Sequence, residues 1–384
     1  MSADSVSDKA KKLHFSSIVI DTHDDTTQLL LNPKFDISAR HTSGNIDVPR
    51  MRDGGLSALF FSIYIPSKTT GPVAIKQALD QIDAVRETVR KHPDDLAFAT
   101  TADEIRAAHK QHKIAALMGV EGGHMIDNDL ATLRSYAALG VRYMTLTHMG
   151  NTDWADSSTD KPTHNGLTDF GKDVIREMNR LGMMVDISHV SDKTFYDVLA
   201  TSKAPVIASH SSCRSISNAA RNMTDDMIRD LAKNGGVIQI NYHISFLSQE
   251  YKDYETAHPE VRAALNAEVQ NRCGKDEDCA DLIGQEVVRD FMRAGKLPRV
   301  EWTAIVDHID HAVKIAGIDH VGLGSDFDGA GMPLGMEDCS HLPQITEALQ
   351  KKGYSDADIR KILGENTLRL MSQVEKVSHD LNSK

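Results

Sequence analysis

Two side chains that commonly bind metals stand two residues apart near the start of the chain, at the end of the segment Ile18-Val-Ile-Asp-Thr-His-Asp-Asp25. Side chains at positions i and i+2 of an extended segment point to the same side. His23 and Asp25 can therefore bind one metal ion together, whereas Asp24 points to the opposite side and is not expected to be a ligand. Aspartate is also common in turns. Taken alone, the pair is better explained by a strand followed by a polar turn, so its interpretation depends on partners elsewhere in the chain.

Five further polar residues occupy comparable positions at the ends of strand-like apolar runs: Glu121, His148, His189, His210 and Asp326. A lone histidine at such a position is more often a structural residue than a ligand. With the first pair, however, they place seven polar residues at six of eight expected strand ends. Each costs free energy on burial unless it is paired or binds a metal. Imidazole and carboxylate groups suit Zn²⁺ and similar ions, so the pattern favours a metal centre.

Glu121 is the candidate bridge between two metal ions. A carboxylate has two oxygens that can bind two neighbouring metals, and the two glycines that follow Glu121 allow a close approach. No lysine stands at a strand end where a carbamylated bridge would be expected. Two metals sharing a water would lower its pKa, so that hydroxide forms near neutral pH. The remaining ligands would be His23 and Asp25 for one ion, and His189 and His210 for the other.

A hydrolytic site also needs a proton donor and a group that orients the substrate. Asp326, in Gly324-Ser-Asp-Phe-Asp-Gly329, is the expected acid/base. Its rival Asp328 lies beyond the strand end, where a structural role in a turn is favoured. His148 can polarise a scissile carbonyl or stabilise a tetrahedral intermediate. Arg221 could form a fork on a substrate carboxylate, although an arginine at this position is equally well explained as a surface salt-bridge residue.

These residues are expected to be positioned by eight strands that alternate with helical stretches. Nearly apolar strands between helices are typical of a parallel sheet covered by helices. Eight such units favour a closed (β/α)8 TIM barrel, which carries its chemistry at the carboxyl ends of the strands. An open doubly-wound sheet is the alternative, but no Gly-x-Gly-x-x-Gly turn follows the first strand. The strands are expected at 17–23, 58–65, 115–121, 141–148, 183–189, 206–210, 237–242 and 320–326.

The rest of the chain is expected to decorate one barrel domain that spans residues 1–384. The connection after the seventh strand, about 245–318, is rich in charged residues and alanine and reads as a helical insertion. No Pro/Gly/Ser linker flanks it, which argues against a separate domain. A C-terminal helical tail is expected over about 344–384.

Composition excludes several other classes of protein. The formal net charge of −12 and a pI near 5.8 argue against nucleic acid and anionic membranes as partners. No apolar stretch approaches the roughly 18 residues of a membrane span. The protein is therefore expected to be soluble, and either cytoplasmic, or periplasmic or secreted with its signal peptide removed. Cys273 and Cys279 are close enough in sequence to pair in an oxidising compartment, but their spacing does not decide it.

Motifs along most of the chain resemble one family, the membrane (renal) dipeptidases, which are zinc metallopeptidases. The resemblance implies a (β/α)8 barrel that hydrolyses dipeptides, in some members with D-residues or β-lactam substrates, and often forms homodimers. It also implies two zinc ions with the ligands named above, and it places His148, Arg221 and Asp326 at substrate-binding and catalytic positions. The motifs are Asp21-Thr-His-Asp-Asp25, Gly119-Val-Glu-Gly-Gly-His124, Arg142-Tyr-Met-Thr-Leu-Thr-His148, Asn151-Thr-Asp-Trp-Ala-Asp156, Asp186-Ile-Ser-His189, Ser209-His-Ser211, Arg221-Asn222 and Gly322-Leu-Gly-Ser-Asp-Phe-Asp-Gly329.

The chain departs from the mammalian members of that family at three places. The first motif reads His-Asp-Asp instead of His-Asn-Asp, which keeps both ligands. The segment Asn241-Tyr-His-Ile-Ser-Phe246 lacks the mammalian pattern, and the insertion around Gln249–Pro298 is longer. Two alternatives remain: an amidohydrolase-like barrel that acts on a non-peptide amide or lactone, and a barrel used for metal or peptide binding or for natural-product maturation.

Overall fold

Eight parallel strands form the centre of the protein in the computed structural model, which describes residues 6–274 and 277–383, without the side chains of residues 277–282. Each strand pairs with the next in the order β1-β2-β4-β5-β6-β7-β8-β9. The strands coincide with the eight apolar runs, and the expected (β/α)8 barrel is confirmed. Their bounds are β1 Ile20–Asp24, β2 Ala58–Tyr64, β4 Ile114–Glu121, β5 Val141–Thr145, β6 Met184–Asp186, β7 Ile207–Ser211, β8 Val237–Ile240 and β9 Val321–Leu323.

The barrel closes between its last and first strands through the residues that follow β9. The Asp326 N–H donates to the His23 carbonyl at 3.0 Å, and the Asp25 N–H donates to the Phe327 carbonyl at 2.8 Å. A ninth strand, β3 (Leu96–Phe98), was not predicted from the sequence. It pairs in parallel with the start of β4, off the barrel path, and is only three residues long.

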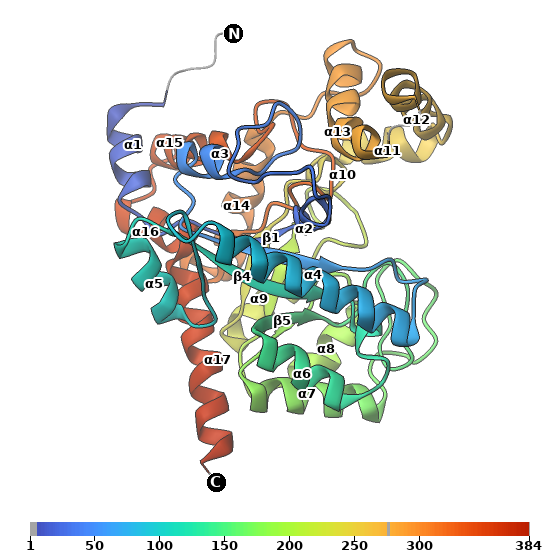
Figure 1. Cartoon of the computed structure of the whole chain (residues 1–384), viewed down its shortest axis with the longest axis vertical. Coiled ribbons are helices and arrows are strands. Elements are labelled where there is room, and N and C mark those ends of the chain that lie inside the picture. The colour runs from blue at the N-terminus through green and yellow to red at the C-terminus, as the bar shows by residue number, and fades with distance from the viewer. Residues whose placement is uncertain (1–5, 275–276, 384) are drawn as a thin grey trace.

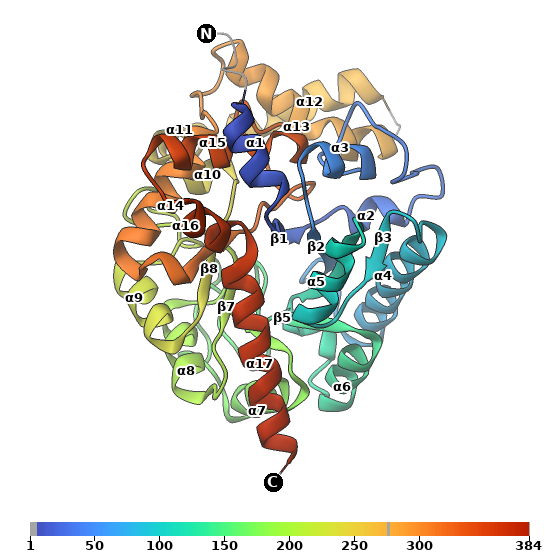
Figure 2. The ribbon, with the colours of Figure 1, turned by 90° about the vertical axis from the view of Figure 1, so that its left-hand side faces the viewer.

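Burial and capping explain why these segments adopt their structures. All eight residues of β4 and all four of β8 are buried, as expected for strands covered on both faces. A typical outer helix, α7, begins where Thr168 Oγ1 accepts from the Gly171 N–H and ends at Gly182, whose φ is 72°. The helices around the barrel are α4 Gly71–Lys91, α6 Leu130–Leu139, α7 Asp169–Leu181, α8 Asp192–Thr201, α9 Asp225–Asn234 and α14 Thr303–Ala316 (Figures 1 and 2).

The C-terminal helix α17 (Asn366–Asn382) closes the amino-terminal end of the barrel. Its residues Leu370 and Val374 share one buried cluster with Ile20, Met184 and Val237, each the first residue of a strand. The second half of α17 lies against the end of α7, where Ser378 Oγ and Asn382 Nδ2 donate to the Arg180 carbonyl (Figure 2). Because this end is filled, the carboxyl ends of the strands are the ones left to form a site.

The long connection after β8 forms a group of helices at one end of the molecule (Figure 1). Within it, α12 and α13 pack against each other, and α14 then returns to the barrel wall beside β8 and β9. The helices of this connection before α14 are α10 Ile244–Leu247, α11 Gln249–Ala257, α12 Glu260–Cys273 and α13 Glu277–Arg293. The remaining helices are α1 Asp8–Phe15, α2 Thr27–Leu30, α3 Val48–Asp53, α5 Ala102–Lys110, α15 Pro343–Lys351 and α16 Asp356–Arg360, with short helical turns at Gly123–Ile126, Ile318–His320, Cys339–His341 and Lys361–Glu365.

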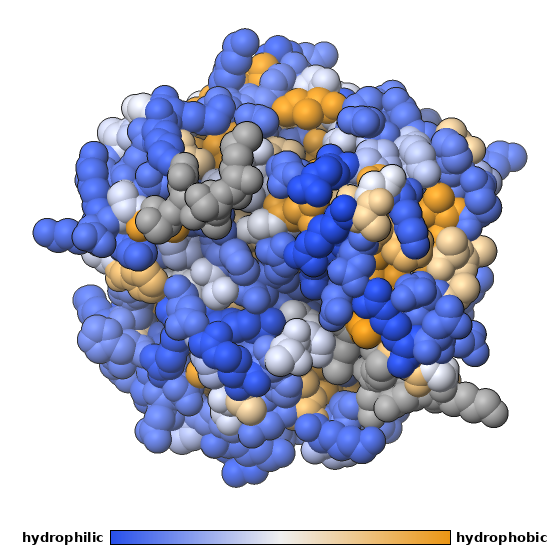
Figure 3. All heavy atoms as spheres, turned by 90° about the horizontal axis from the view of Figure 1, so that it is seen from above, coloured by the Kyte–Doolittle hydropathy of each residue, from blue (hydrophilic) through white to orange (hydrophobic). Residues whose placement is uncertain are grey.

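The surface seen from above is largely hydrophilic, with apolar side chains in patches between polar ones (Figure 3). Within the part of the chain that the structure describes, no helix is both long enough and apolar enough to span a bilayer.

Candidate metal centre and active site

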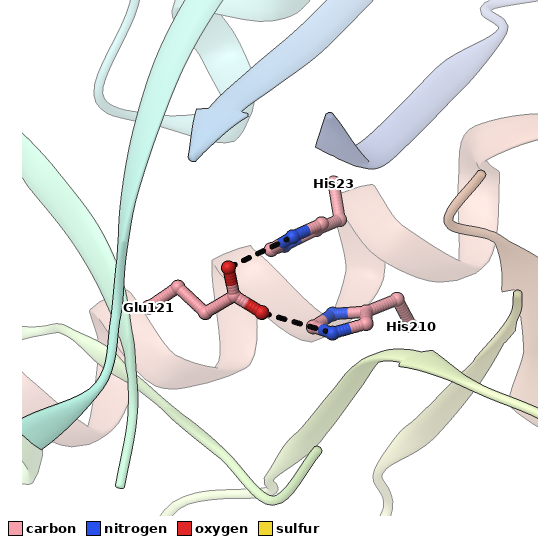
Figure 4. A group of neighbouring side chains, drawn as sticks. All are labelled: His23, Glu121 and His210. Atoms are coloured by element: carbon pink, nitrogen blue, oxygen red, sulfur yellow. Dashed lines mark ion pairs between the residues drawn. The ribbon is translucent and has the colours of Figure 1, made fainter. Parts of the chain in front are cut away.

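Glu121, the last residue of β4, lies at the centre of a histidine cluster. Its Oε1 lies 3.0 Å from His189 Nε2 and 3.2 Å from His210 Nε2. Its Oε2 lies 3.5 Å from His23 Nε2. Figure 4 shows His23 and His210 pointing toward different oxygens of the carboxylate. Each oxygen therefore faces its own ligand group, which is the arrangement that a bridging carboxylate requires.

The other predicted residues extend this cluster on both sides. Asp25 Oδ2 lies 3.7 Å from His23 Nε2, and His148 Nε2 lies 3.8 Å from Glu121 Oε1. Three groups of residues bring one possible ligand atom each within 4.8 Å of one another: His23, Glu121 and His210; Glu121, His148 and His189; and His23, Asp25 and Asp326. The structure therefore brings all five predicted ligands together, and it places His148 and Asp326 at the edge of the same centre.

Several buried donor atoms of the cluster lack a hydrogen-bond partner within it and are suited to bind a divalent metal. His23 Nε2 and Asp25 Oδ1 are buried without a hydrogen-bond partner. Burial and the negative charge of Glu121 raise the pKa of Asp25 to about 7. Burial also acts to raise the pKa of Glu121, but the surrounding histidines hold it well below its usual range. A cation would keep both carboxylates ionised, and nitrogen and oxygen donors of these types suit zinc and related ions.

A chain of hydrogen bonds fixes the ring of His210. Ser209 Oγ donates to Asp186 Oδ2 at 2.6 Å, and His210 Nδ1 lies 2.7 Å from Ser209 Oγ. The hydroxyl has one proton, which it gives to Asp186, so it accepts from His210 Nδ1–H. This tautomer leaves the Nε2 lone pair facing Glu121. Support of this kind behind a ligand orients the ring and raises its basicity.

His23 is supported differently, from inside the barrel. Its Nδ1 lies 2.8 Å from the hydroxyl of Tyr143, a fully buried residue of β5. Tyr143 fits there because residue 119 of the neighbouring strand is glycine. A Cβ at Gly119 would lie 1.9 Å from Tyr143 Cζ. The glycine therefore makes room for the side chain that holds the first ligand.

Two site residues adopt a left-handed backbone conformation that is unfavourable for side chains other than glycine. The φ angles are 67° for His189 and 64° for Asp326. Such residues cost of order 1–3 kcal/mol each and persist where the surroundings hold them, often at functional sites. Both residues follow the last residue of their strands, β6 and β9, by three positions. The turns thus direct their side chains into the centre.

Asp326 and Asp328 have different surroundings. Asp326 Oδ2 accepts a hydrogen bond from Asn241 Nδ2 at 2.9 Å, and its Oδ1 has no such bond. Asp328 accepts from the Thr26 hydroxyl at 2.6 Å and from the Asn45 N–H at 2.7 Å, so both of its oxygens tie loops together. This contrast favours Asp326 as the acid/base, as expected from the sequence.

Arg221 brings a buried positive charge to the same site. Its Nη2 donates to the His210 carbonyl at 3.1 Å, while its Nε and Nη1 are buried without a partner. Burial lowers its pKa to about 10, which leaves the guanidinium charged at neutral pH. It stacks over the ring of Phe246 at 5.4 Å. Two free donors on a fixed guanidinium suit a carboxylate, so Arg221 is not a surface salt-bridge residue.

One cavity of about 790 Å³ joins these groups. Its lining includes Asp25, Glu121, His148, His189, Arg221 and Asp326, together with residues of the insertion. The volume is in the range of small-molecule sites. A small molecule in this cavity can reach the candidate metal ligands, a fixed cation and a carboxyl group at once.

Comparison with known proteins decides the family. A family model described as membrane dipeptidase (Peptidase family M19) matches residues 7–384. The chain belongs to the M19 membrane dipeptidases. Dipeptidase 3 of Mus musculus and of Rattus norvegicus are each 35% identical over 370 residues. These matches cover 94% of this chain and 65% of each relative, so the chain spans about two thirds of their length.

Solved structures agree with the M19 assignment and confirm the fold. A metallopeptidase of Rhodobacter sphaeroides, liganded with a phosphinate mimic of the dipeptide L-Ala-D-Ala, is 27% identical, with a TM-score of 0.77 over 93% of this chain and 99% of that one. The probable dipeptidase PvdM of Pseudomonas aeruginosa is 28% identical, with a TM-score of 0.78 over 96% of this chain and 98% of its own.

Other residues considered in the sequence lie outside the candidate metal centre or outside the described side chains. Trp154, in the motif Asn151-Thr-Asp-Trp-Ala-Asp156, is buried beside Phe170 and does not line the cavity. Asp24 accepts from the Thr26 N–H and belongs to none of the three metal-binding groups. Cys279, whose pairing with Cys273 the sequence spacing does not decide, lies outside the residues whose side chains are described.

Three supporting residues were not recognised as functional from the sequence: Tyr143, Asp186 and Ser209. Each stands in a motif of the family resemblance, and each is buried in a barrel strand. Their place in those motifs is the signal that could have found them.

Proposed function

We propose that this protein is a binuclear zinc dipeptidase that hydrolyses the peptide bond of dipeptides. The observation that carries the proposal is the position of Glu121, whose two oxygens face separate histidines within the cavity that also holds the free donors of Arg221. Membership of the M19 family and the metallopeptidase neighbours support it.

His23 and Asp25 would hold one zinc ion, His189 and His210 the other, and Glu121 would bridge them. Zinc ions in such a centre supply a nucleophile at neutral pH and a Lewis acid for the carbonyl oxygen. His148 lies beside Glu121 and His189, so it is placed to donate a hydrogen bond to the reacting carbonyl oxygen as negative charge develops there.

Arg221 would bind the C-terminal carboxylate of the dipeptide through Nε and Nη1. Its contact with the His210 carbonyl keeps this anchor beside a metal ligand, which sets the distance from the carboxylate to the reacting bond. Asp326 keeps Oδ1 free while Asn241 holds Oδ2. Asp326 Oδ1 would therefore take a proton from the attacking water and deliver it to the leaving nitrogen.

The relative from Rhodobacter sphaeroides holds a mimic of L-Ala-D-Ala. We therefore extend the proposal to dipeptides with a D-residue at the C-terminal position. By family resemblance we also propose a homodimer, which light scattering coupled to size exclusion tests directly.

Asp326→Asn is the variant that tests the mechanism. We expect it to retain the zinc content of the wild type, measured by elemental analysis, and to lose at least about a hundredfold in kcat for Ala-Ala and Ala-D-Ala, because general acid–base groups contribute roughly 10²- to 10⁴-fold. Asp328→Asn is the matched control and should retain most of the activity. Full activity of Asp326→Asn would show that the acid/base is assigned wrongly.

A further inference from the structure

A second cavity lies beneath the insertion and adjoins the candidate active site. It measures about 480 Å³. Six residues line both this space and the main cavity: His243, Glu255, Arg262, Gly284, Val288 and Gly331. The two spaces are therefore neighbours with a common wall of residues from α11, α12, α13 and the loops after β8 and β9. We call the second space the insertion pocket.

Much of the lining that belongs to the insertion pocket and not to the main cavity is apolar, although Tyr251, His258 and Asn266 also line it. Ile244 and Leu297 are buried, and Val261, Leu265 and Val288 are partly buried members of the hydrophobic core. None of these side chains can hydrogen-bond to a ligand. A pocket with such walls favours an apolar group, which gains free energy by leaving water.

Polar groups gather where the two spaces meet. Glu255 accepts a hydrogen bond from Ser245 Oγ at 2.9 Å, and Arg262 is an exposed residue of α12. Glu255 and Arg262 carry opposite charges, so together they give the junction no strong preference for a charged substrate group. This leaves the apolar wall as the selective feature.

The position of Arg221 decides which part of a dipeptide faces the insertion pocket. Its guanidinium lies over Phe246, and the ring of Phe246 packs edge-on against His243 at 4.6 Å between centroids. His243 lines both cavities. The proposed anchor for the substrate carboxylate is thus linked to the junction by two ring contacts. The C-terminal residue, which carries that carboxylate, is the one beside the insertion pocket.

We infer that the insertion pocket is a subsite for a large apolar side chain on the C-terminal residue of the dipeptide. This inference rests on the proposed function, because it uses Arg221 as the carboxylate anchor. It makes Leu265, which lines only the insertion pocket, a residue that determines specificity. The insertion would then select the substrate through this residue and its apolar neighbours.

The first test compares dipeptides on the wild-type, zinc-loaded enzyme. We expect kcat/KM for Ala-Phe and Ala-Leu to exceed that for Ala-Ala by at least about tenfold, because even one added methylene in an apolar pocket can contribute about this much. Phe-Ala, which carries the same side chain at the other position, should gain less than Ala-Phe. Equal values for Ala-Ala and Ala-Phe, or a larger gain for Phe-Ala, would overturn the inference.

The second test fills the pocket. Leu265→Trp should lower the ratio of kcat/KM for Ala-Phe to that for Ala-Ala by at least about fivefold, because the added ring occupies the space of the substrate side chain. Ala267→Trp adds the same bulk to the exposed side of the same helix and is the matched control. Zinc content and circular dichroism establish whether both variants fold. If Leu265→Trp does not fold, the comparison of dipeptides on the wild-type enzyme still tests the inference.

Two outcomes separate the inference from the proposed function. If Ala-Glu is the best substrate and Arg262→Gln removes that preference, the junction charge selects the substrate and the apolar subsite is wrong. If no dipeptide is hydrolysed at all, the proposed function itself fails and the subsite fails with it.

Discussion

Replacing Ser209 by alanine should weaken one metal site without touching a ligand. The hydroxyl of Ser209 accepts a hydrogen bond from His210 Nδ1 at 2.7 Å and donates one to Asp186 Oδ2 at 2.6 Å. Ser209→Ala removes both bonds. His210 Nδ1 then loses the group that fixes its tautomer, and Asp186 Oδ2 keeps only the bond from Thr145 at 2.5 Å.

The expected magnitude follows from the loss of this support. Removing the hydrogen-bond partner behind a metal-binding histidine typically lowers metal affinity about 10- to 100-fold, or about 1.4 to 2.7 kcal/mol. In the proposed centre, the ion assigned to His189 and His210 should be affected and the ion assigned to His23 and Asp25 should not, because His23 is supported by Tyr143.

Zinc affinity measured by competition with a chelator tests this prediction. Ser211→Ala is the matched control, since Ser211 is equally buried in β7 and its hydroxyl makes only a 3.4 Å contact with Ser188. If the centre holds two ions as proposed, we expect Ser209→Ala to release one of them at a chelator concentration that leaves the control loaded. Identical titration curves for the two variants would refute the role assigned to Ser209.

Three further predictions follow from buried groups. Asp25→Asn should lose metal while Asp24→Asn should retain it in elemental analysis, because only Asp25 belongs to a metal-binding group; equal metal loss would contradict the site. Gly119→Ala should lower the midpoint of thermal unfolding and weaken zinc binding together, since its Cβ would lie 1.9 Å from Tyr143 Cζ; a variant that behaves like the wild type would show that Tyr143 moves freely. Burial lowers the pKa of His14 from 6.5 to about 4. As the pH falls, His14 therefore binds a proton in the unfolded chain before it does so in the folded protein. The free energy of unfolding should fall between about pH 6.5 and 4, and His14 should contribute up to about 3 kcal/mol of this loss. Denaturant unfolding at pH 7 and pH 5 should therefore show a smaller pH effect for His14→Gln than for the wild type, and an equal effect would contradict it.

The barrel, and the gathering of the candidate ligands at one end of it, could be predicted from the sequence because both leave local signals. Most barrel strands are largely apolar runs, and His23, Glu121 and His210 stand at or near the ends of their strands. β3 was missed because three residues, Leu96–Phe98, are too few to form a recognisable pattern.

What could not be predicted depends on contacts between distant residues. His23 and Tyr143 are 120 positions apart, so nothing in either local segment indicates their hydrogen bond. The contact of Arg221 with the His210 carbonyl requires the turn between them, and only the structure distinguishes a buried Arg221 from a surface residue. The insertion pocket likewise exists only once α12 and α13 lie over the barrel.

Stepwise reconstitution of the metal-free protein with zinc, followed by hydrolysis of a dipeptide, tests the central claim most directly. With Glu121 as the bridge, we predict that activity on Ala-Ala or Ala-D-Ala rises with added zinc and reaches its maximum at two equivalents per chain, and that Glu121→Gln never reaches it. Full activity before zinc is added, or a fully loaded protein that cleaves neither dipeptide, would contradict the account.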